Sequence, residues 1–206
     1  MGRAFRSRTG GTDRSDSRRH AMFAHHSNAF AIGIPALCAS VGPMGLFAGT
    51  KLETETGWRD VAELTPGDRL YTMDGGLRPL RALRAEAGTD DAVRLPAGVL
   101  GADAETSLPP GQLLLLETGW AIDWLGTPVA LVRAADLVGH LGIRRRAAPA
   151  TTLLAPVLGE EEVLFAATGL RVFAAGAATL IGPEHFALLT REEVGPVLEA
   201  APCRAA

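Results

Sequence analysis

The sequence predicts a single, mostly β domain with a tail on either side. Its 206 residues are enough to bury one hydrophobic core, and 47% hydrophobic with 21% charged residues is the composition of a globular protein. From Thr50 onward, short runs of strand-like composition alternate with turns rich in glycine and proline. Because few segments carry a helical pattern, we expect the domain to be built mainly from strands.

The first expected elements are strands joined by tight turns. Leu52 and Thr54 alternate with charged residues, as in a half-buried strand. Pro66 and Gly67 indicate a turn, because proline presets one backbone dihedral and glycine tolerates positive φ. Residues 70–72 form a second β-prone run, and Asp-Gly-Gly at 74–76 is typical of a hairpin.

Further runs of strand length follow along the chain. Their composition predicts strands over 92–95, 113–117, 129–132, 151–154 and 163–166. Helices are predicted only over 133–140 and 191–200.

The stretch before the domain is basic and then apolar. Residues 1–27 are polar and rich in arginine, which predicts disorder, and residues 29–50 are uncharged. We interpret the apolar run as a linker, because Pro35 and Pro43 make it too broken to cross a membrane as a helix. A basic lead before an apolar run is also the outline of a signal peptide, so secretion is the alternative to a cytoplasmic location.

Charge and cysteine usage narrow the function classes. A net charge of -3 gives no support for a general nucleic-acid or membrane-surface role. Cys38 and Cys203 lie far apart and cannot form a disulfide framework or a four-ligand zinc site by themselves. The histidine cluster at 20–26 has no cysteine or acidic pair at ligand spacing. No metal and no cofactor is therefore expected.

Spaced motifs begin with GTKLETETGWRDVAELTPGDRLYTMDGG at 49–76. The positions that hold this pattern are Gly49, Thr50, Leu52, Thr54, Gly57, Val61, Leu64, Gly67, Asp68, Leu70, Thr72, Asp74, Gly75 and Gly76. Three later blocks follow in order: VRLPAGVLG at 93–101, Leu131-Val132 with Ala134 and Leu137, and EVLFA at 162–166 with Gly169. Together these motifs resemble the Hint domain, the self-processing module of hedgehog proteins and inteins, in its bacterial branch.

The resemblance implies a fold and a domain organisation. The family fold is a horseshoe-shaped β structure of two pseudo-symmetric halves with few short helices. It would span 45–172, preceded by a disordered basic tail and apolar linker at 1–44 and followed by a partly helical extension at 173–206.

The same resemblance implies a chemistry and the residues that it needs. In the family, the thiol of the first cysteine attacks the preceding peptide bond, and a histidine of the motif S-P-x-H protonates the departing nitrogen. Here Gly45, or Leu46 with one deletion, aligns with that cysteine, and Gln112 aligns with the histidine. A further histidine late in the domain is replaced by Glu161. No catalytic residue is therefore assigned to this chain.

These departures favour a degenerate domain without self-cleavage that acts as a structural or binding module. Its partner would be a protein of unknown identity, bound at an apolar patch near Leu46 and Phe47. The first alternative is an autoprocessing domain that cleaves its own upstream peptide bond with an unorthodox nucleophile. The second is a Hint-like remnant in which the tails do the work.

Other reactive or bulky residues have simpler interpretations. Cys38 lies too far upstream to replace the nucleophile, and His185 sits in a P-x-H motif at the wrong place in the chain. The arginines at 144–146 are expected in a solvated loop, and Trp58, Trp120 and Trp124 in core or half-buried positions.

Overall fold

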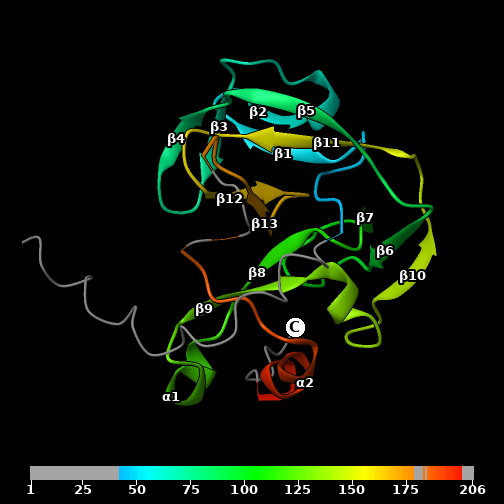
Figure 1. The fold of residues 1–206 in the computed structure, drawn as a ribbon, viewed down its shortest axis with the longest axis vertical. Helices are drawn as coiled ribbons and strands as arrows, with labels where there is room; N and C mark the ends of the chain where they lie inside the picture. The colour runs from blue at the N-terminus through cyan, green and yellow to red at the C-terminus, as the bar shows by residue number, and fades with distance from the viewer. Residues whose placement is uncertain (1–41, 179–182, 184, 201–206) are drawn as a thin grey trace, which may run out of the picture. The chain divides into compact units, whose positions relative to one another are not determined.

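Strands dominate the computed structural model, which describes residues 42–178, 183 and 185–200 (Figure 1). All of these residues belong to one compact unit. The basic tail, most of the apolar run, Cys38, Cys203 and the histidines at 20–26 lie outside the described residues.

One large antiparallel sheet contains eight strands. Its order is β2 (Gly57–Asp60), β1 (Lys51–Thr54), β3 (Arg69–Thr72), β12 (Glu162–Ala166), β13 (Leu170–Ala174), β8 (Leu113–Glu117) and β9 (Val129–Arg133), with β4 (Gly76–Pro79) paired to β3. The β12–β13 hairpin joins distant parts of the chain, because Leu164 pairs with Thr72 and Val172 pairs with Leu114. This pairing sets the start of β8 beside β13.

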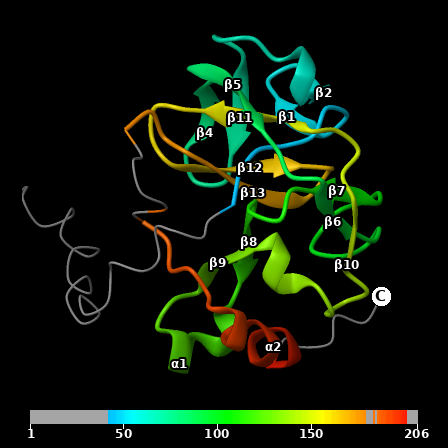
Figure 2. The same cartoon turned by 45° about the vertical axis from the view of Figure 1, so that its right-hand side comes forward.

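Two smaller sheets complete the β structure. One has the order β10 (Arg144–Ala147), β6 (Asp91–Leu95) and β7 (Thr106–Leu108). The other consists of β11 (Thr152–Val157) and β5 (Ala82–Ala87), which run side by side in Figures 1 and 2. Every strand predicted from the sequence is present, whereas β2, β4, β5, β7, β10 and β13 were not predicted.

The helical segments of the described residues are short. They are the 3-10 turns η2 (Val61–Glu63), η3 (Gly119–Ala121) and η4 (Ala134–Leu137) and the α-helices α1 (Ile122–Leu125) and α2 (Arg191–Ala200). The predicted helix over 191–200 is confirmed as α2, and the one over 133–140 is wrong. Arg133 ends strand β9, η4 follows it, and Gly139 and Leu141 then take positive φ values of 101° and 50°, which a right-handed helix cannot contain. None of the helices in the described ranges has the length and apolar character needed to cross a bilayer.

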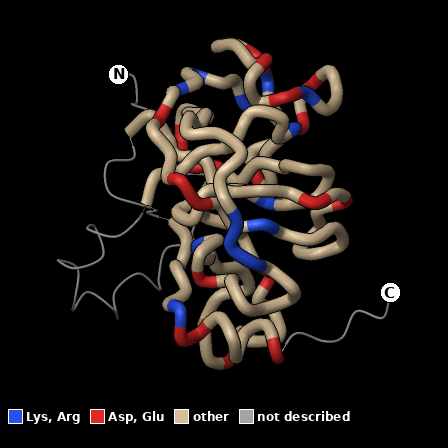
Figure 3. The backbone as a smooth tube through the Cα atoms, turned by 90° about the vertical axis from the view of Figure 1, so that its right-hand side faces the viewer, with Lys and Arg blue, Asp and Glu red and all other residues tan. Residues whose placement is uncertain are grey.

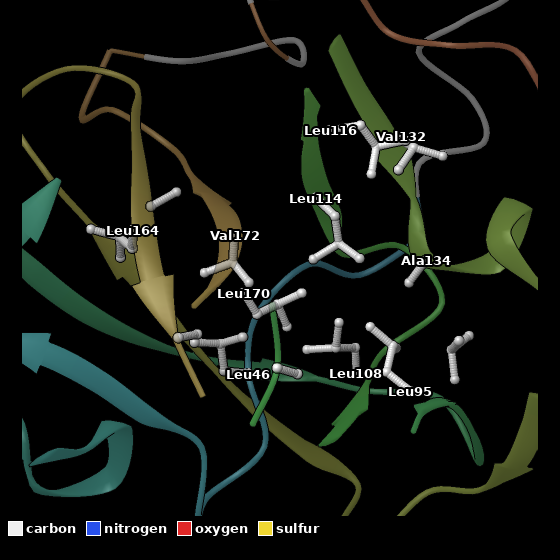
Figure 4. Close-up of a cluster of buried hydrophobic side chains, with 14 of the residues drawn as sticks. Leu46, Leu95, Leu108, Leu114, Leu116, Val132, Ala134, Leu164, Leu170 and Val172 are labelled. Atoms are coloured by element: carbon white, nitrogen blue, oxygen red, sulfur yellow. The ribbon is translucent and has the colours of Figure 1, made fainter. Parts of the chain in front are cut away.

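The core lies between the sheets and draws on both halves of the chain (Figure 4). Strand β8 contributes to two clusters, with Leu114 and Leu116 in the larger one and Leu113 and Leu115 in the other. Successive side chains of a strand point to opposite faces, so β8 is covered on both. Each fully buried leucine contributes about 1.5–3 kcal/mol of hydrophobic free energy relative to an exposed one.

Three surface expectations need correction. Leu46 and Phe47 are 1% and 3% exposed, so no apolar patch lies there, because both side chains pack in core clusters. Trp124 is 51% exposed and Trp120 37%, since short segments at the tip between β8 and β9 carry them. The arginines at 144–146 are solvated as expected, but they form strand β10 rather than a loop, because they pair with β6.

Candidate functional site

A single residue just before the first strand, Leu46, pairs with β11. The backbone N–H of Leu46 donates to the carbonyl of Leu154 at 2.9 Å, and the N–H of Leu154 donates back to Leu46 at 2.8 Å. This pair is an isolated antiparallel bridge that fixes the backbone of Gly45 next to β11.

Gln112 reaches the same place from the turn before β8. Its side chain is buried, and its Oε1 accepts a hydrogen bond from the backbone N–H of Gly45 at 3.0 Å. Its Nε2 donates to the carbonyls of Phe173 and Leu113, each at 2.9 Å. Because carbonyls only accept hydrogen bonds, they fix which end of the amide faces Gly45. Gln112 therefore ties together the upstream segment, β8 and β13.

Close backbone approach brings the two segments together. A Cβ atom added to Gly111 would lie 2.2 Å from the carbonyl oxygen of Gly42 and 2.8 Å from that of Pro43. Only glycine leaves room for this contact. The turn is closed by the N–H of Gln112, which donates to Pro109 at 3.0 Å.

The backbone of Gly45 is unsuited to a side chain. Its φ is 148°, in the region that favours glycine, and a Cβ atom there would lie 3.0 Å from Leu153 Cβ and 3.2 Å from the Leu154 oxygen. Leu46 is the other residue expected from the sequence at the family's cysteine position, and its side chain is buried in the main core cluster. Neither position directs a reactive side chain to a cavity.

A cleft of about 240 Å³ opens beside Gly45 and Gln112. Its apolar part includes Leu164 and Val172, while Arg84 and Glu86 of β5 are exposed and line its mouth. Among the described residues that line it, there is no cysteine, serine, threonine or histidine. The cleft therefore offers space and charge, and its lining carries no nucleophile of the kind that starts acyl transfer.

Glu161 lies elsewhere. It precedes β12, and its Oε2 accepts a hydrogen bond from the backbone N–H of His185 at 3.4 Å. Neither residue lines the cleft. The structure thus brings Gly45, Leu46 and Gln112 together and leaves Glu161 apart. Within 42–178, 183 and 185–200, no cluster of three or more His, Cys, Asp and Glu residues is arranged to hold a metal ion.

Sequence reasoning missed Arg84 and Glu86. Their strand, ALRAEA, is rich in alanine, arginine and glutamate, which favour helices over strands. The sequence does show that Arg84 and Glu86 have opposite charges and stand two positions apart. In a strand, residues at this spacing lie on the same face.

Comparison with known proteins agrees with this architecture. The family model described as the Hint domain matches residues 44–172. A bacterial intein-like domain from Clostridium thermocellum is similar in structure, with a TM-score of 0.50, 11% identity and coverage of 64% of this chain and 99% of that one. A splice-inactive variant of the AceL NrdHF class 3 split intein has a TM-score of 0.45 and 15% identity, and covers 65% of this chain and 98% of its own. No curated protein is significantly similar to the chain. The family model matches more than half of the residues of this chain, and the chain therefore belongs to the Hint domain family.

Proposed function

We propose that this Hint domain does not cleave its own chain and acts as a structural or binding module. In this proposal, Gly45 or Leu46 stands at the nucleophile position of the family, and Gln112 stands at the position of the acid. The observation that carries it is the hydrogen bond from the Gly45 N–H to Gln112 Oε1.

Cleavage of the bond between Met44 and Gly45 would need a nucleophile and an acid. The nucleophile must attack the carbonyl carbon of Met44, and Gly45 has no side chain with which to do so. The acid must give a proton to the nitrogen of Gly45 as that nitrogen leaves. Gln112 presents an acceptor oxygen to this nitrogen, and an amide does not transfer protons near neutral pH. In this proposal, neither requirement of the first step is met.

Gln112 instead attaches the upstream segment to the body of the domain. Its three hydrogen bonds are buried, and buried hydrogen bonds of this kind hold a segment in one position because breaking them leaves polar groups unsatisfied. The upstream segment is thus fixed at the position where an active domain would release it. A partner protein would then bind a domain that is still covalently joined to its upstream segment.

Intact-mass spectrometry of the purified chain tests this proposal. With and without a thiol and hydroxylamine, which trap thioesters, we expect one unchanged species of 21.5 kDa. A time-dependent species that lacks the residues before Gly45, formed faster in hydroxylamine, would overturn the proposal and support autoprocessing. Cleavage in the absence of hydroxylamine at unrelated sites would identify a contaminating protease, which a protease-inhibitor control removes.

A further inference from the structure

One edge of strand β5 has no partner strand among the residues that the structure describes. Its other edge pairs with β11 over 82–87, and the two strands lie side by side in Figures 1 and 2. Unpaired strand edges expose backbone donors and acceptors that can pair with another chain. The free edge of β5 is therefore a candidate interaction surface.

The hydrogen-bond alternation shows which residues face that edge. Gly88 donates its N–H to Thr151 at 2.7 Å, so Gly88 faces β11, and residues of an antiparallel strand alternate in direction. Leu83, Ala85 and Ala87 then direct their N–H and C=O groups away from β11. The position of Pro156 is consistent with this assignment. Pro156 has no N–H, and it stands opposite Leu83, where β11 directs no N–H toward β5.

The sequence of this edge is complementary to itself. If a second copy runs antiparallel about Ala85, then Arg84 stands opposite Glu86 of the second copy, and Glu86 stands opposite its Arg84. The same register sets Leu83 opposite Ala87 and lets the outward backbone groups of both strands pair. We propose that the chain forms a homodimer in which β5 pairs with β5 of a second copy, centred on Ala85.

The charged side chains are available for this pairing. The side chains of Arg84 and Glu86 are exposed and share the face that lines the cleft. Neither side chain makes a hydrogen bond or ion pair with another described residue. Other arginines do have carboxylate partners, such as Arg78 with Glu162 at 3.1 Å. Ala85 and Ala87 are also exposed and small, so they leave room for a second backbone.

The unpaired edge of strand β10 differs from that of β5 in its charge pattern. Among the described residues, strand β10 pairs with β6 and with no other strand. Its three consecutive arginines form a long blue stretch in Figure 3. Antiparallel self-pairing of β10 would set arginine against arginine, and like charges directly opposite each other destabilise a sheet. Of these two edges, β5 alone carries complementary charges.

Sedimentation of the full chain across a concentration series tests the dimer. We expect a reversible shift from 21.5 kDa toward twice that mass, with an affinity in the micromolar range or weaker, because a single strand pair is a small interface. A chain that stays monomeric up to the highest soluble concentration would overturn the proposal.

Charge exchange tests the register. Arg84→Glu and Glu86→Arg each turn two attractive cross-strand pairs into repulsive ones, and we expect each to weaken the dimer by about tenfold or more. The double exchange, Arg84→Glu with Glu86→Arg, restores the pairs and should restore the dimer. An equimolar mixture of the two single variants should form a heterodimer, since every pair across it is then opposite in charge.

Two controls keep the test decisive. Circular dichroism and melting of each variant show that the monomer is folded, and Arg145→Glu changes an arginine of the same charge on the β10 edge without touching β5. Three results would each refute β5 pairing. The first is a dimer that persists in both single variants, and the second is a double-exchange variant that stays monomeric. The third is a loss of dimer in Arg145→Glu as large as in the β5 variants. Ala85→Pro removes one outward N–H while leaving the β11 ladder, and it should also give a folded monomer.

Discussion

The backbone N–H of Gly45 donates a hydrogen bond to the side-chain Oε1 of Gln112, a residue 67 positions away in the sequence. The same amide group donates through Nε2 to the carbonyls of Leu113 and Phe173. One buried side chain thus joins the segment before β1 to strands β8 and β13. An acceptor at this position stabilises the peptide bond it touches, whereas cleavage of that bond would need a proton donor.

Removing this side chain should destabilise the domain. Gln112→Ala leaves the Gly45 N–H and the Phe173 carbonyl without their partner, so we expect a loss of about 2–4 kcal/mol in the free energy of unfolding. The melting temperature should fall by about 5–10 °C, as read by calorimetry. Glu53→Ala, a change on strand β1 away from this site, serves as the control and should alter stability by about 0.5 kcal/mol or less. Equal losses in the two variants would show that Gln112 does not hold the segment.

Adding the chemical groups that the family uses should not produce cleavage. Gly45→Cys combined with Gln112→His supplies a thiol and an acid, but a Cβ atom at position 45 requires a φ near 148° and a 3.0 Å contact with Leu153. We expect an uncleaved and destabilised protein in intact-mass spectra with hydroxylamine.

The matched control for this experiment is Gly45→Ala with Gln112→His, which carries the same backbone strain and no thiol. If the cysteine variant loses its upstream segment while the alanine variant stays whole, then the site has kept its catalytic geometry. That result would make the absent side chains the sole barrier to cleavage.

The sequence predicted the strands whose local pattern is strong. Strand β8, Leu113–Glu117, was predicted because an apolar run stands between turn signals. Strands β5 and β10 were missed because alanine, arginine and glutamate have low strand propensity, and tertiary pairing with β11 and β6 determines their conformation. The helix predicted over 133–140 rested on periodicity alone. Periodicity does not reveal the residues with positive φ in this segment, which a right-handed helix cannot contain.

The site was predictable only in part. Motif spacing identified Gly45 and Gln112 as candidate positions, and the structure brings them into contact. The partners of the Gln112 amide could not be foreseen, because Phe173 lies 61 positions away and only the pairing of β8 with β13 brings it near. Glu161 followed from the same spacing argument, yet it lies beside His185 and outside the cleft.

Acid should weaken the turn at Asp68 selectively. The N–H of Thr65 donates to the Asp68 carboxylate at 2.7 Å, and together with Arg59 at 3.0 Å it lowers the pKa of Asp68 below 3.8. A folded-state pKa below the unfolded value means that this stabilisation is present above pH 3.8 and is lost as the pH falls through the folded pKa. The stability gap between the wild type and Asp68→Asn should therefore be largest near neutral pH and shrink in acid.

Thermal melting over a pH series measures this gap. Asp74→Asn removes the same charge from the next turn and serves as the control for the loss of one carboxylate, because no side-chain hydrogen bond to Asp74 is formed within the described residues. A gap at Asp68 that stayed constant from neutral pH into acid would mean that its ionised form does not stabilise the turn.

The close approach of Gly111 to Gly42 makes the upstream segment sensitive to one methyl group. In Gly111→Ala the new Cβ atom would lie 2.2 Å from the Gly42 oxygen, so residues 42–46 must shift or the turn before β8 must open. We expect a loss of about 1–3 kcal/mol, the usual range for overpacking, and faster limited proteolysis near Met44. Gly119→Ala is the matched control, because a Cβ atom there has no neighbour within 4 Å, and it should change stability by about 0.5 kcal/mol or less. If Gly111→Ala destabilised the core without exposing Met44 to protease, the turn rather than the upstream segment would bear the strain. The hydrogen bonds to Gln112 and Leu154 would then hold that segment in place without the Gly111 contact.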